Sequence, residues 1–338
     1  MTELLDLNNV TEKIKILMAQ ARLKVAKEVN QHLVKTYWEV GRIIVEHEQQ
    51  GDIKAQYGTR LLQDLSKSLI KDLGTGFSVS NLQFMRRFFL EYPIQQTLSV
   101  KLSWSHICEL LIISDKDKRA FYEQECINSG WSVRELRRQI GTSLFERLLL
   151  SDGQTNKETV LALSKQGIVI DKPQDILKDP YVFEFLGVRE EKPILEKDLE
   201  CKLIRHIEDF LLELGRGFMF VGSQQRITLG GTHYYVDMVF YNKILKAYVL
   251  IDLKTGHLTP EHVGQMNMYL NYYNSEVNET DDQKAIGIVL CADKHDVMAE
   301  FALGGLENNI FASRYTYYIP DKEQLISEVK ALLAHENA

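Results

Sequence analysis

Two acidic residues and a lysine interrupt apolar stretches in the C-terminal half of the chain, and this pattern restricts the fold more than any other feature. Residues 236–241 are apolar except for Asp237, and residues 248–253 are apolar except for Asp252. Both stretches have the length and composition of strands. Side chains alternate along a strand, so Asp252 and Lys254 point to the same face. Charges on such a strand are costly unless a partner or a metal ion compensates them.

A short polar turn joins the two predicted strands, which favours an antiparallel hairpin. In that hairpin Asp237 lies beside Asp252, and two like charges at such a distance need a cation between them. Carboxylate oxygens are ligands that Mg²⁺ prefers. The pattern therefore predicts a divalent-metal site of the kind that hydrolyses phosphodiester bonds.

Length and composition are sufficient for two folded domains. The chain has 338 residues, of which 45% are hydrophobic and 26% charged, and this is typical of proteins with buried cores. No apolar run reaches the roughly 18 residues of a membrane span, and the N-terminus lacks the features of a signal peptide. The four cysteines do not have the spacing of a zinc site. These features predict a cytoplasmic protein that does not bind membranes.

Charge is distributed unevenly between the two halves. Residues 1–150 contain 21 basic and 18 acidic residues, whereas the remainder contains 19 basic and 29 acidic residues. The overall isoelectric point of about 5.8 argues against a general polyanion-binding protein. Contact with nucleic acid must therefore come from local basic faces, or from metal ions that offset the acidic residues.

The first half of the chain has the apolar periodicity of helices. Helices are predicted over residues 9–48 and 59–73, and a third from Val79 to Glu91 with Ser78 as its N-cap. Glycines at 74 and 76 form the turn before the third helix. This outline is typical of a helix-turn-helix, in which Asn81, Arg86 and Arg87 face DNA. The alternative is an ordinary helical hairpin.

Three more short helices are predicted before residue 150. Gly130 ends one of them, and Ser132 with Glu135 forms a capping box for the next. The face of that helix carries basic residues at helical spacing, which would form a phosphate-binding stripe: Arg134, Arg137 and Arg138. The alternative is a solvated basic face. The run from the Ser-His pair to Ser-Val-Arg-Glu-Leu resembles the helical DNA-binding core of ParB-type partition proteins, which favours DNA binding.

The second half alternates between helices and strands. Residues 151–180 predict a linker with one short strand at 167–170, followed by an apolar segment at 181–188. The order that follows is αβββαβ, which predicts an α/β sandwich. The predicted helices are 196–214, one starting at Thr259-Pro260, one near 293–302 and one from 321, and the predicted strands are 217–227, 233–241, 247–254, 285–291 and 313–319.

This order, with Asp and then Asp-x-Lys on the strands, resembles the PD-(D/E)XK nuclease superfamily. The chain as a whole resembles the YhcG-like family of bacterial proteins. That resemblance implies a helical N-terminal domain followed by such a nuclease domain. With the patterns above, we expect a helix-turn-helix-like domain at 1–150 that binds DNA or a partner, a linker at 151–180, and a restriction-endonuclease-like nuclease domain at 181–338. The segments that carry the resemblance are YWEVGR, GFSVSNLQFMRRF, LSWSHI, GWSVRELRRQI, FLLELGRGFMFVGSQ, YYVDMVFYN and YVLIDLKTGHLTPEHVGQMNMYL.

The resemblance also assigns roles to the strand residues. It implies that Asp237 and Asp252 bind a metal ion, with the carbonyl oxygen of Leu253 as a further ligand. Lys254 would position or deprotonate the attacking water. The expected ion is Mg²⁺, with Mn²⁺ as a substitute. Val236 departs from the signature, which has proline at this position, and Asp252 stands where glutamate is more frequent.

Two further positions come from the flanking helices. Gln265 matches the glutamine that the superfamily often carries on the helix after the strands. Glu200 matches the acidic residue that completes the site in resolvase-like members, and Glu208 is a weaker alternative two turns later.

The leading hypothesis is a metal-dependent DNA endonuclease of a bacterial cell. One alternative is a catalytically silent DNA-binding or scaffolding protein of a mobile-element or defence locus, and another is an RNA-directed nuclease. The intact set of acidic residues and lysine argues against a silent protein. The sequence does not determine substrate preference, the biological pathway or the oligomeric state, and a homodimer is one option.

Overall fold

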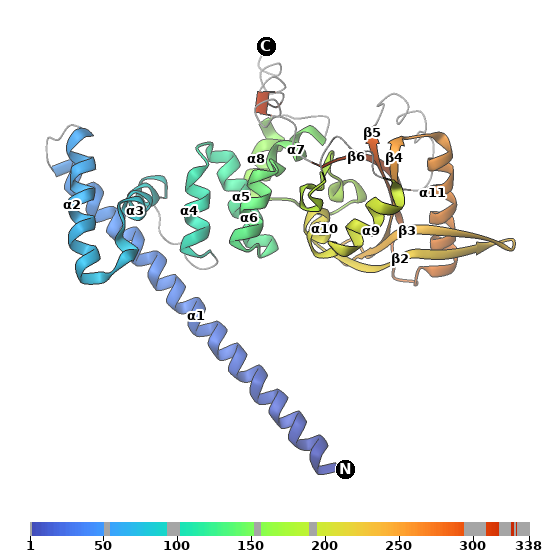
Figure 1. Cartoon of the computed structure of the whole chain (residues 1–338), viewed down its shortest axis with the longest axis horizontal. Helices are drawn as coiled ribbons and strands as arrows, with labels where there is room; N and C mark the ends of the chain where they lie inside the picture. The colour runs from blue at the N-terminus through green and yellow to red at the C-terminus, as the bar shows by residue number, and fades with distance from the viewer. Residues whose placement is uncertain are drawn as a thin grey trace. The chain divides into compact units, whose positions relative to one another are not determined.

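The structure is a computed structural model that describes residues 2–50, 55–92, 102–151, 157–188, 195–293 and 309–317, together with 326, 327 and 329 (Figure 1). The chain forms two compact units. The first contains residues 1–119 and 126–136, and the second contains residues 120–125 and 137–338. Among the described residues, no helix has both the length and the apolar character needed to cross a membrane.

The first unit is helical, as the sequence predicts. Its apolar core includes Ile44, Leu62, Leu82 and Met85. The first and third helices approach closely at Gly41, since a Cβ atom there would lie 2.0 Å from the carbonyl oxygen of Met85. The helices that contribute to this unit are α1 (Thr2–Gln50), α2 (Ala55–Leu73), α3 (Val79–Glu91), α4 (Trp104–Ile112), α5 (Lys116–Ser129) and the first residues of α6 (Val133–Gly141), with a short 3-10 helix η1 (Thr75–Phe77) before α3.

The helix boundaries predicted from capping residues are confirmed. The Ser78 hydroxyl accepts a hydrogen bond from the backbone N–H of Asn81 at 3.3 Å, so α3 begins where its N-cap indicates. Gly130 ends α5 in the left-handed conformation, with φ of 66°. Ser132 and Glu135 form the predicted reciprocal capping box at the start of α6.

The segment predicted as a linker contains regular structure in its described residues. Residues 157–166 form helix α8 (Lys157–Gln166), and a 3-10 helix η2 (Pro173–Ile176) follows. No strand forms at 167–170, where the backbone N–H of Ile168 instead donates to the Glu125 carboxylate at 2.6 Å. Gly167 directly follows α8, and Pro173 begins η2.

The second unit contains a six-stranded mixed sheet with the order β1-β6-β5-β4-β3-β2. Strands β2, β3 and β4 form an antiparallel meander, and β4, β5, β6 and β1 are parallel to one another. The three-stranded meander agrees with the prediction from sequence. The strands are β1 (Tyr181–Val182), β2 (Phe218–Leu229), β3 (Thr232–Asn242), β4 (Ala247–His257), β5 (Ile286–Asp293) and β6 (Asn309–Thr316), and a 3-10 helix η3 (Glu184–Leu186) follows β1.

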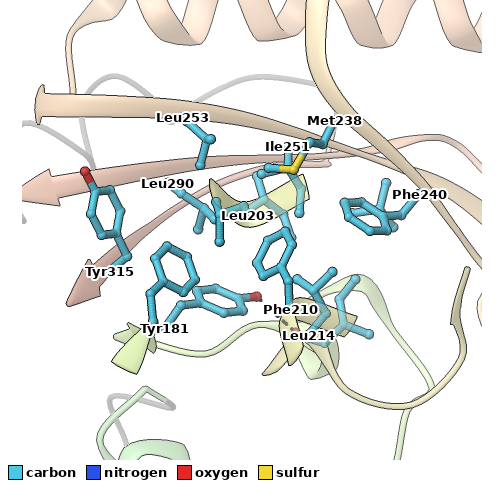
Figure 2. Packing of buried hydrophobic residues seen from close by; sticks show 14 of the residues in the cluster. Tyr181, Leu203, Phe210, Leu214, Met238, Phe240, Ile251, Leu253, Leu290 and Tyr315 are labelled. Carbon is cyan, nitrogen blue, oxygen red and sulfur yellow. Dashed lines mark hydrogen bonds between the residues drawn. The ribbon is translucent and has the colours of Figure 1, made fainter. Parts of the chain in front are cut away.

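Helices cover both faces of this sheet. Helices α9 (Glu196–Arg205) and α10 (Ile207–Leu214) pack on one face (Figure 2), and α11 (Pro260–Tyr272) packs on the other with the π-helix η4 (Tyr273–Val277) after it. The single helix predicted over 196–214 is in fact broken at His206, which ends α9 and precedes α10. The helices predicted near 293–302 and from 321 lie largely outside the described residues.

A buried cluster of charges joins α10 to α7 (Leu144–Ser151) and to the end of α6 within the second unit. Glu213 and Arg147 are both fully buried and form an ion pair of 2.7 Å. The Arg138 guanidinium adds a second ion pair with Glu213 at 3.1 Å and a third with Glu184 at 2.6 Å. The buried Lys178 ammonium donates to the backbone carbonyl of Glu213.

The pKa values in this cluster follow from the number of cations around one carboxylate. Burial raises the pKa of Glu213, but Arg147, Lys178 and Arg138 outweigh burial and hold the pKa at about 2. Burial lowers the pKa of Lys178 to about 8, against the opposing attraction of Glu213. The cluster is therefore a paired ionic centre of the fold.

Candidate active site

The two predicted acidic residues of the strands meet in the hairpin of β3 and β4. The strands pair antiparallel with Met238 opposite Ile251, one residue inside the acidic positions. The backbone N–H of Leu253 donates to the Asp237 carboxylate at 2.9 Å. This bond fixes the Asp237 side chain beside the segment that carries Asp252, as the predicted hairpin requires.

Asp252 is a buried carboxylate with one close cation. Its side chain lies on a strand whose neighbours form the sheet core, and the residue is 3% exposed. One carboxylate oxygen lies 2.8 Å from the Lys254 ammonium. Apart from this ion pair, the buried oxygen has no hydrogen-bond partner among the described residues, so it retains unused acceptor capacity. Burial, with a smaller contribution from Asp237, raises the pKa of Asp252 to about 6 despite the opposing effect of Lys254.

Lys254 stays a cation in this arrangement. Burial lowers the pKa of Lys254, but the carboxylates of Asp252, Glu196 and Asp237 outweigh burial and place the pKa above its ordinary value. The Glu196 carboxylate lies 3.7 Å from the Lys254 ammonium. Of the two roles expected for Lys254, these charges favour positioning of a water molecule over its deprotonation.

Glu200 on α9, rather than Glu208 on α10, lies close to the strand residues. Glu200 is 8% exposed, whereas Glu208 is exposed beyond the break at His206. The amide nitrogen of Gln224 donates to the Glu200 carboxylate at 2.9 Å and to Asp237 at 3.2 Å. Burial raises the pKa values of both Glu200 and Asp237. Three carboxylates with raised pKa values therefore lie in one region.

Helix α11 contributes the predicted glutamine through a chain of hydrogen bonds. Gln265 donates to the hydroxyl of Tyr269 at 2.5 Å, and that hydroxyl donates to the backbone carbonyl of Tyr235 on β3 at 2.9 Å. Burial raises the pKa of Tyr269, and Asp252 and Asp237 raise it further, so Tyr269 lies within the field of the carboxylates. His262 accepts a hydrogen bond from the Thr259 backbone N–H and caps α11.

Sequence reasoning missed two residues of this region. Glu196 lies one helical turn before Glu200, and this spacing could have identified it. Gln224 lies in β2 with φ of 48°, a conformation unusual for glutamine, and its contacts depend on that backbone conformation. No pattern of residue types along the strand indicates such a φ value.

The residues fit a divalent metal ion. Among the described residues, no three His, Cys, Asp or Glu side chains already converge in ligand geometry. The donor set is nevertheless suited to a hard cation, because it consists of carboxylate oxygens with raised pKa values and includes the buried Asp252 oxygen without a hydrogen bond. The Gln224 amide lies within hydrogen-bonding distance of both Glu200 and Asp237, where it partly offsets their charge.

The predicted DNA-contacting residues of α3 make contacts within the first unit. The Asn81 side chain donates to the carbonyl of Gly76 and accepts a hydrogen bond from the Trp104 indole at 2.8 Å. The Arg86 guanidinium pairs with Glu48 at 2.7 Å and remains 39% exposed. Arg87 is half-buried on the same helix. Asn81 and Arg86 therefore stabilise the helical unit, with Arg86 still partly accessible.

The predicted basic stripe on α6 does not extend over all three arginines. Arg134 and Arg137 are exposed. Arg138 is 14% exposed in its side chain, and its guanidinium is paired with Glu184 and Glu213. Because both carboxylates already bind it, the prediction that Arg138 contacts phosphate is corrected to a role in the buried ionic cluster.

Known proteins resemble this chain in sequence along nearly its whole length. The model of the YhcG PDDEXK nuclease domain matches residues 174–330, and the model of the DUF1016 N-terminal domain matches residues 13–147. The protein named "Putative nuclease YhcG" of Escherichia coli (strain K12) is 39% identical over 345 residues, which cover 93% of this chain and 91% of that protein. The crystal structure of a repair endonuclease from Pyrococcus abyssi aligns at 16% identity and a TM-score of 0.26 over 37% of this chain and 49% of that chain, a likeness too small to carry an argument.

Proposed function

The chain belongs to the YhcG family, and from this premise we propose that it is a divalent-metal-dependent endonuclease that hydrolyses phosphodiester bonds of DNA. The observation that carries the proposal is the set formed by Asp237, Asp252 and Lys254 at the end of the β3–β4 hairpin. Two carboxylates share one lysine there, and burial raises the pKa values of both carboxylates. A second cation would complete the charge balance.

The described residues divide into metal-binding and water-positioning groups under this proposal. Asp237, Asp252, Glu200 and the carbonyl oxygen of Leu253 would hold Mg²⁺ or Mn²⁺. When bound, such an ion supplies an acidified water and charge stabilisation for the phosphoryl group. Lys254, a cation held by Asp252 at 2.8 Å, orients the attacking water by donating a hydrogen bond to it.

Gln265 lies on α11, which covers the face of the sheet opposite to α9 and α10. Its amide is held by Tyr269, which in turn donates to the β3 backbone, so its orientation is coupled to the strand that carries Asp237. We assign it the role of orienting either the substrate phosphate or the lysine. Both roles use a neutral amide, which adds no charge to a site that already carries the carboxylates of Asp237, Asp252, Glu200 and Glu196.

The helical unit is proposed to bind the DNA backbone. Exposed guanidinium groups are suited to phosphate contacts, and the part of α6 that belongs to this unit exposes Arg134, while Arg137 is exposed one turn later in the second unit. On α3 the partly exposed Arg86, with Arg87 and Asn81 nearby in sequence, offers a second basic region. Such contacts are independent of base sequence and position the duplex.

The proposal is tested with purified full-length protein and a panel of linear, nicked, branched and single-stranded DNAs and RNAs, in Mg²⁺, Mn²⁺ or EDTA. Metal-dependent cleavage of DNA is expected, and an Asp252→Asn protein prepared in parallel is expected to be inactive. Cleavage of RNA alone would move the substrate class to RNA. Binding of DNA without cleavage under every condition would instead support a silent DNA-binding or scaffolding protein.

A further inference from the structure

One side chain of the candidate site occupies a strained position in the sheet. Gln224 lies in β2 with φ of 48°, in the left-handed region that glycine adopts freely and glutamine does not. Its neighbours keep regular pairing, with Ser223 opposite Met238 and Gln225 opposite Val236. Gln224 lies between these two residues and Asp237 lies between their partners, so the two are at the same level of the neighbouring strands.

The local sequence accommodates this conformation. The register of β2 against β3 shifts between Phe220 and Gly222, just before Gln224. A Cβ atom on Gly222 would lie 2.4 Å from the side-chain amide nitrogen of Gln225, so the neighbouring glutamine lies against Gly222. The two adjacent glutamines thus have different surroundings, and Gln224 is the one that donates hydrogen bonds to Glu200 and Asp237 among the described residues.

The side chain of Gln224 connects two elements that are far apart in the sequence. Its amide nitrogen donates to Glu200 on α9 at 2.9 Å and to Asp237 on β3 at 3.2 Å. Both hydrogen bonds run from a neutral donor to a carboxylate, and such bonds are stronger than bonds between neutral groups. The amide therefore reduces the repulsion between the two acidic groups.

We propose that Gln224 is a competitor of the metal ion: in the metal-free protein its amide occupies the Glu200 and Asp237 oxygens that a divalent cation would bind, and the cation displaces it. This inference rests on the proposed function. A Mg²⁺ or Mn²⁺ ion needs carboxylate oxygens at about 2.0–2.2 Å. An amide N–H group directed at the same two oxygens competes with the ion, because its dipole presents its positive end to the cation.

If the Gln224 amide competes with the cation, removal of the Gln224 side chain should tighten metal binding. Gln224→Gly removes the competing amide, and glycine adopts a positive φ without strain. The hydrogen bonds from Gln224 to Glu200 and Asp237 stabilise the metal-free state. Because the variant lacks these bonds, its Mn²⁺ binding should be about tenfold tighter. Gln224→Glu keeps the size of the side chain but replaces the donor by a ligand, and it should tighten Mn²⁺ binding at least as much.

The experiment is calorimetric titration of Mn²⁺ alone into the full-length protein, which needs no substrate and no turnover. The matched control is Gln225→Glu, which adds the same charge one residue along the strand and should leave the Mn²⁺ affinity near that of the wild type. Wild-type or weaker Mn²⁺ binding by Gln224→Gly would overturn the inference, because a merely structural or pre-organising glutamine predicts that result.

An Asp252→Asn protein separates this inference from the proposed function. One outcome is that the wild type binds Mn²⁺, Asp252→Asn does not, and Gln224→Gly binds no more tightly than the wild type. This outcome would support the metal site and contradict the proposed role of Gln224. If the wild type itself binds no Mn²⁺, the proposed metal site fails, and the inference fails with it.

Discussion

The second unit contains two groups of buried carboxylates that differ in the balance of charge around them. Glu213 is surrounded by Arg147, Arg138 and Lys178, and its pKa is held at about 2. Asp252 has one close cation, Lys254, and an acidic neighbour, Asp237, and its pKa is raised to about 6. Both carboxylates are almost completely inaccessible to solvent.

The difference separates a structural role from a functional one. A carboxylate with several cations is already satisfied within the protein, so its charge stabilises the arrangement of the helices around it. Buried carboxylates with too few cations around them destabilise the folded, metal-free protein. A bound cation can remove this destabilisation. The comparison therefore predicts that changes at Glu213 act on stability, and that changes at the Asp252 group act on metal binding and catalysis.

The largest expected effect is on catalysis, from Asp252→Asn. Removal of a metal-binding carboxylate should reduce the cleavage rate by at least about 10³-fold, because the metal ion supplies several kcal/mol of transition-state stabilisation. The free energy of unfolding should change little, since the substitution removes an under-paired buried charge. Cleavage rates and urea unfolding of the same preparations check both parts, and a wild-type rate would contradict the site.

Glu213→Gln should lower the free energy of unfolding and leave metal binding unchanged, which is the opposite of the effects of Asp252→Asn. Removal of this carboxylate leaves Arg147, Arg138 and Lys178 buried without their shared partner, and should cost about 3–5 kcal/mol of the free energy of unfolding. The fraction that remains folded should bind Mn²⁺ with wild-type affinity. The two measurements are urea unfolding and calorimetric titration, and loss of metal affinity without loss of stability would reverse the comparison.

The pH dependence of stability provides a further test of the same cluster. The folded pKa of Glu213 lies at about 2, below its ordinary value of 4.5. A lowered carboxylate pKa contributes stability that is fully present above the unfolded value and is lost as the pH falls through the folded value. The loss between about pH 4.5 and 2 should amount to roughly 3 kcal/mol. Unfolding curves of the wild type and Glu213→Gln over this range should converge at low pH, and parallel curves would contradict the pairing.

Glu200→Gln and Glu208→Gln distinguish the two candidates for the third acidic ligand. Glu200 is 8% exposed and bonded to Gln224, whereas Glu208 is exposed on the next helix. Replacement of Glu200 by a neutral amide should raise the Mg²⁺ concentration for half-maximal cleavage by about tenfold, and replacement of Glu208 should not change it. Titration of Mg²⁺ against the cleavage rate gives the answer, and the reverse order would transfer the ligand to Glu208.

Sequence patterns predicted the framework of the site because the framework depends on local rules. Alternation along two apolar stretches determines that Asp237 and Asp252 meet in a hairpin, and Thr259 with Pro260 marks the start of α11. Capping residues likewise located α3 and α6. These signals act within a few residues, so one chain is enough to recognise them.

The parts that sequence patterns missed depend on contacts between distant segments. Arg138 has the helical spacing of a surface stripe, yet its partner Glu213 is 75 residues away, and no periodicity indicates that pairing. The role of Gln224 depends on a positive φ in a strand, which its residue type does not favour. Charge balance in three dimensions, rather than composition, decides which polar residues belong to the site.

The smallest expected effect compares two arginines of one helix that differ in pairing. Arg134 is exposed on α6, whereas Arg138 is paired with Glu184 and Glu213. If the exposed face contacts DNA phosphate, Arg134→Gln should reduce the slope of log affinity against log salt concentration by about 0.9. Arg138→Gln should leave that slope unchanged and should lower the free energy of unfolding instead.

Both substitutions are best made in the full-length Asp252→Asn protein, so that cleavage does not consume the duplex. Fluorescence anisotropy with a labelled duplex, measured over a series of salt concentrations, gives the slopes, and urea unfolding of the same proteins gives their stabilities. Both residues are arginines, so a difference between the variants reflects ion pairing within the protein. Loss of the exposed arginine should change the salt dependence of DNA affinity, and loss of the paired arginine should change the free energy of unfolding. Equal slopes for the parent protein and Arg134→Gln would remove this face of α6 from the DNA-binding surface, and a reduced slope for Arg138→Gln would mean that its ion pairs open on DNA.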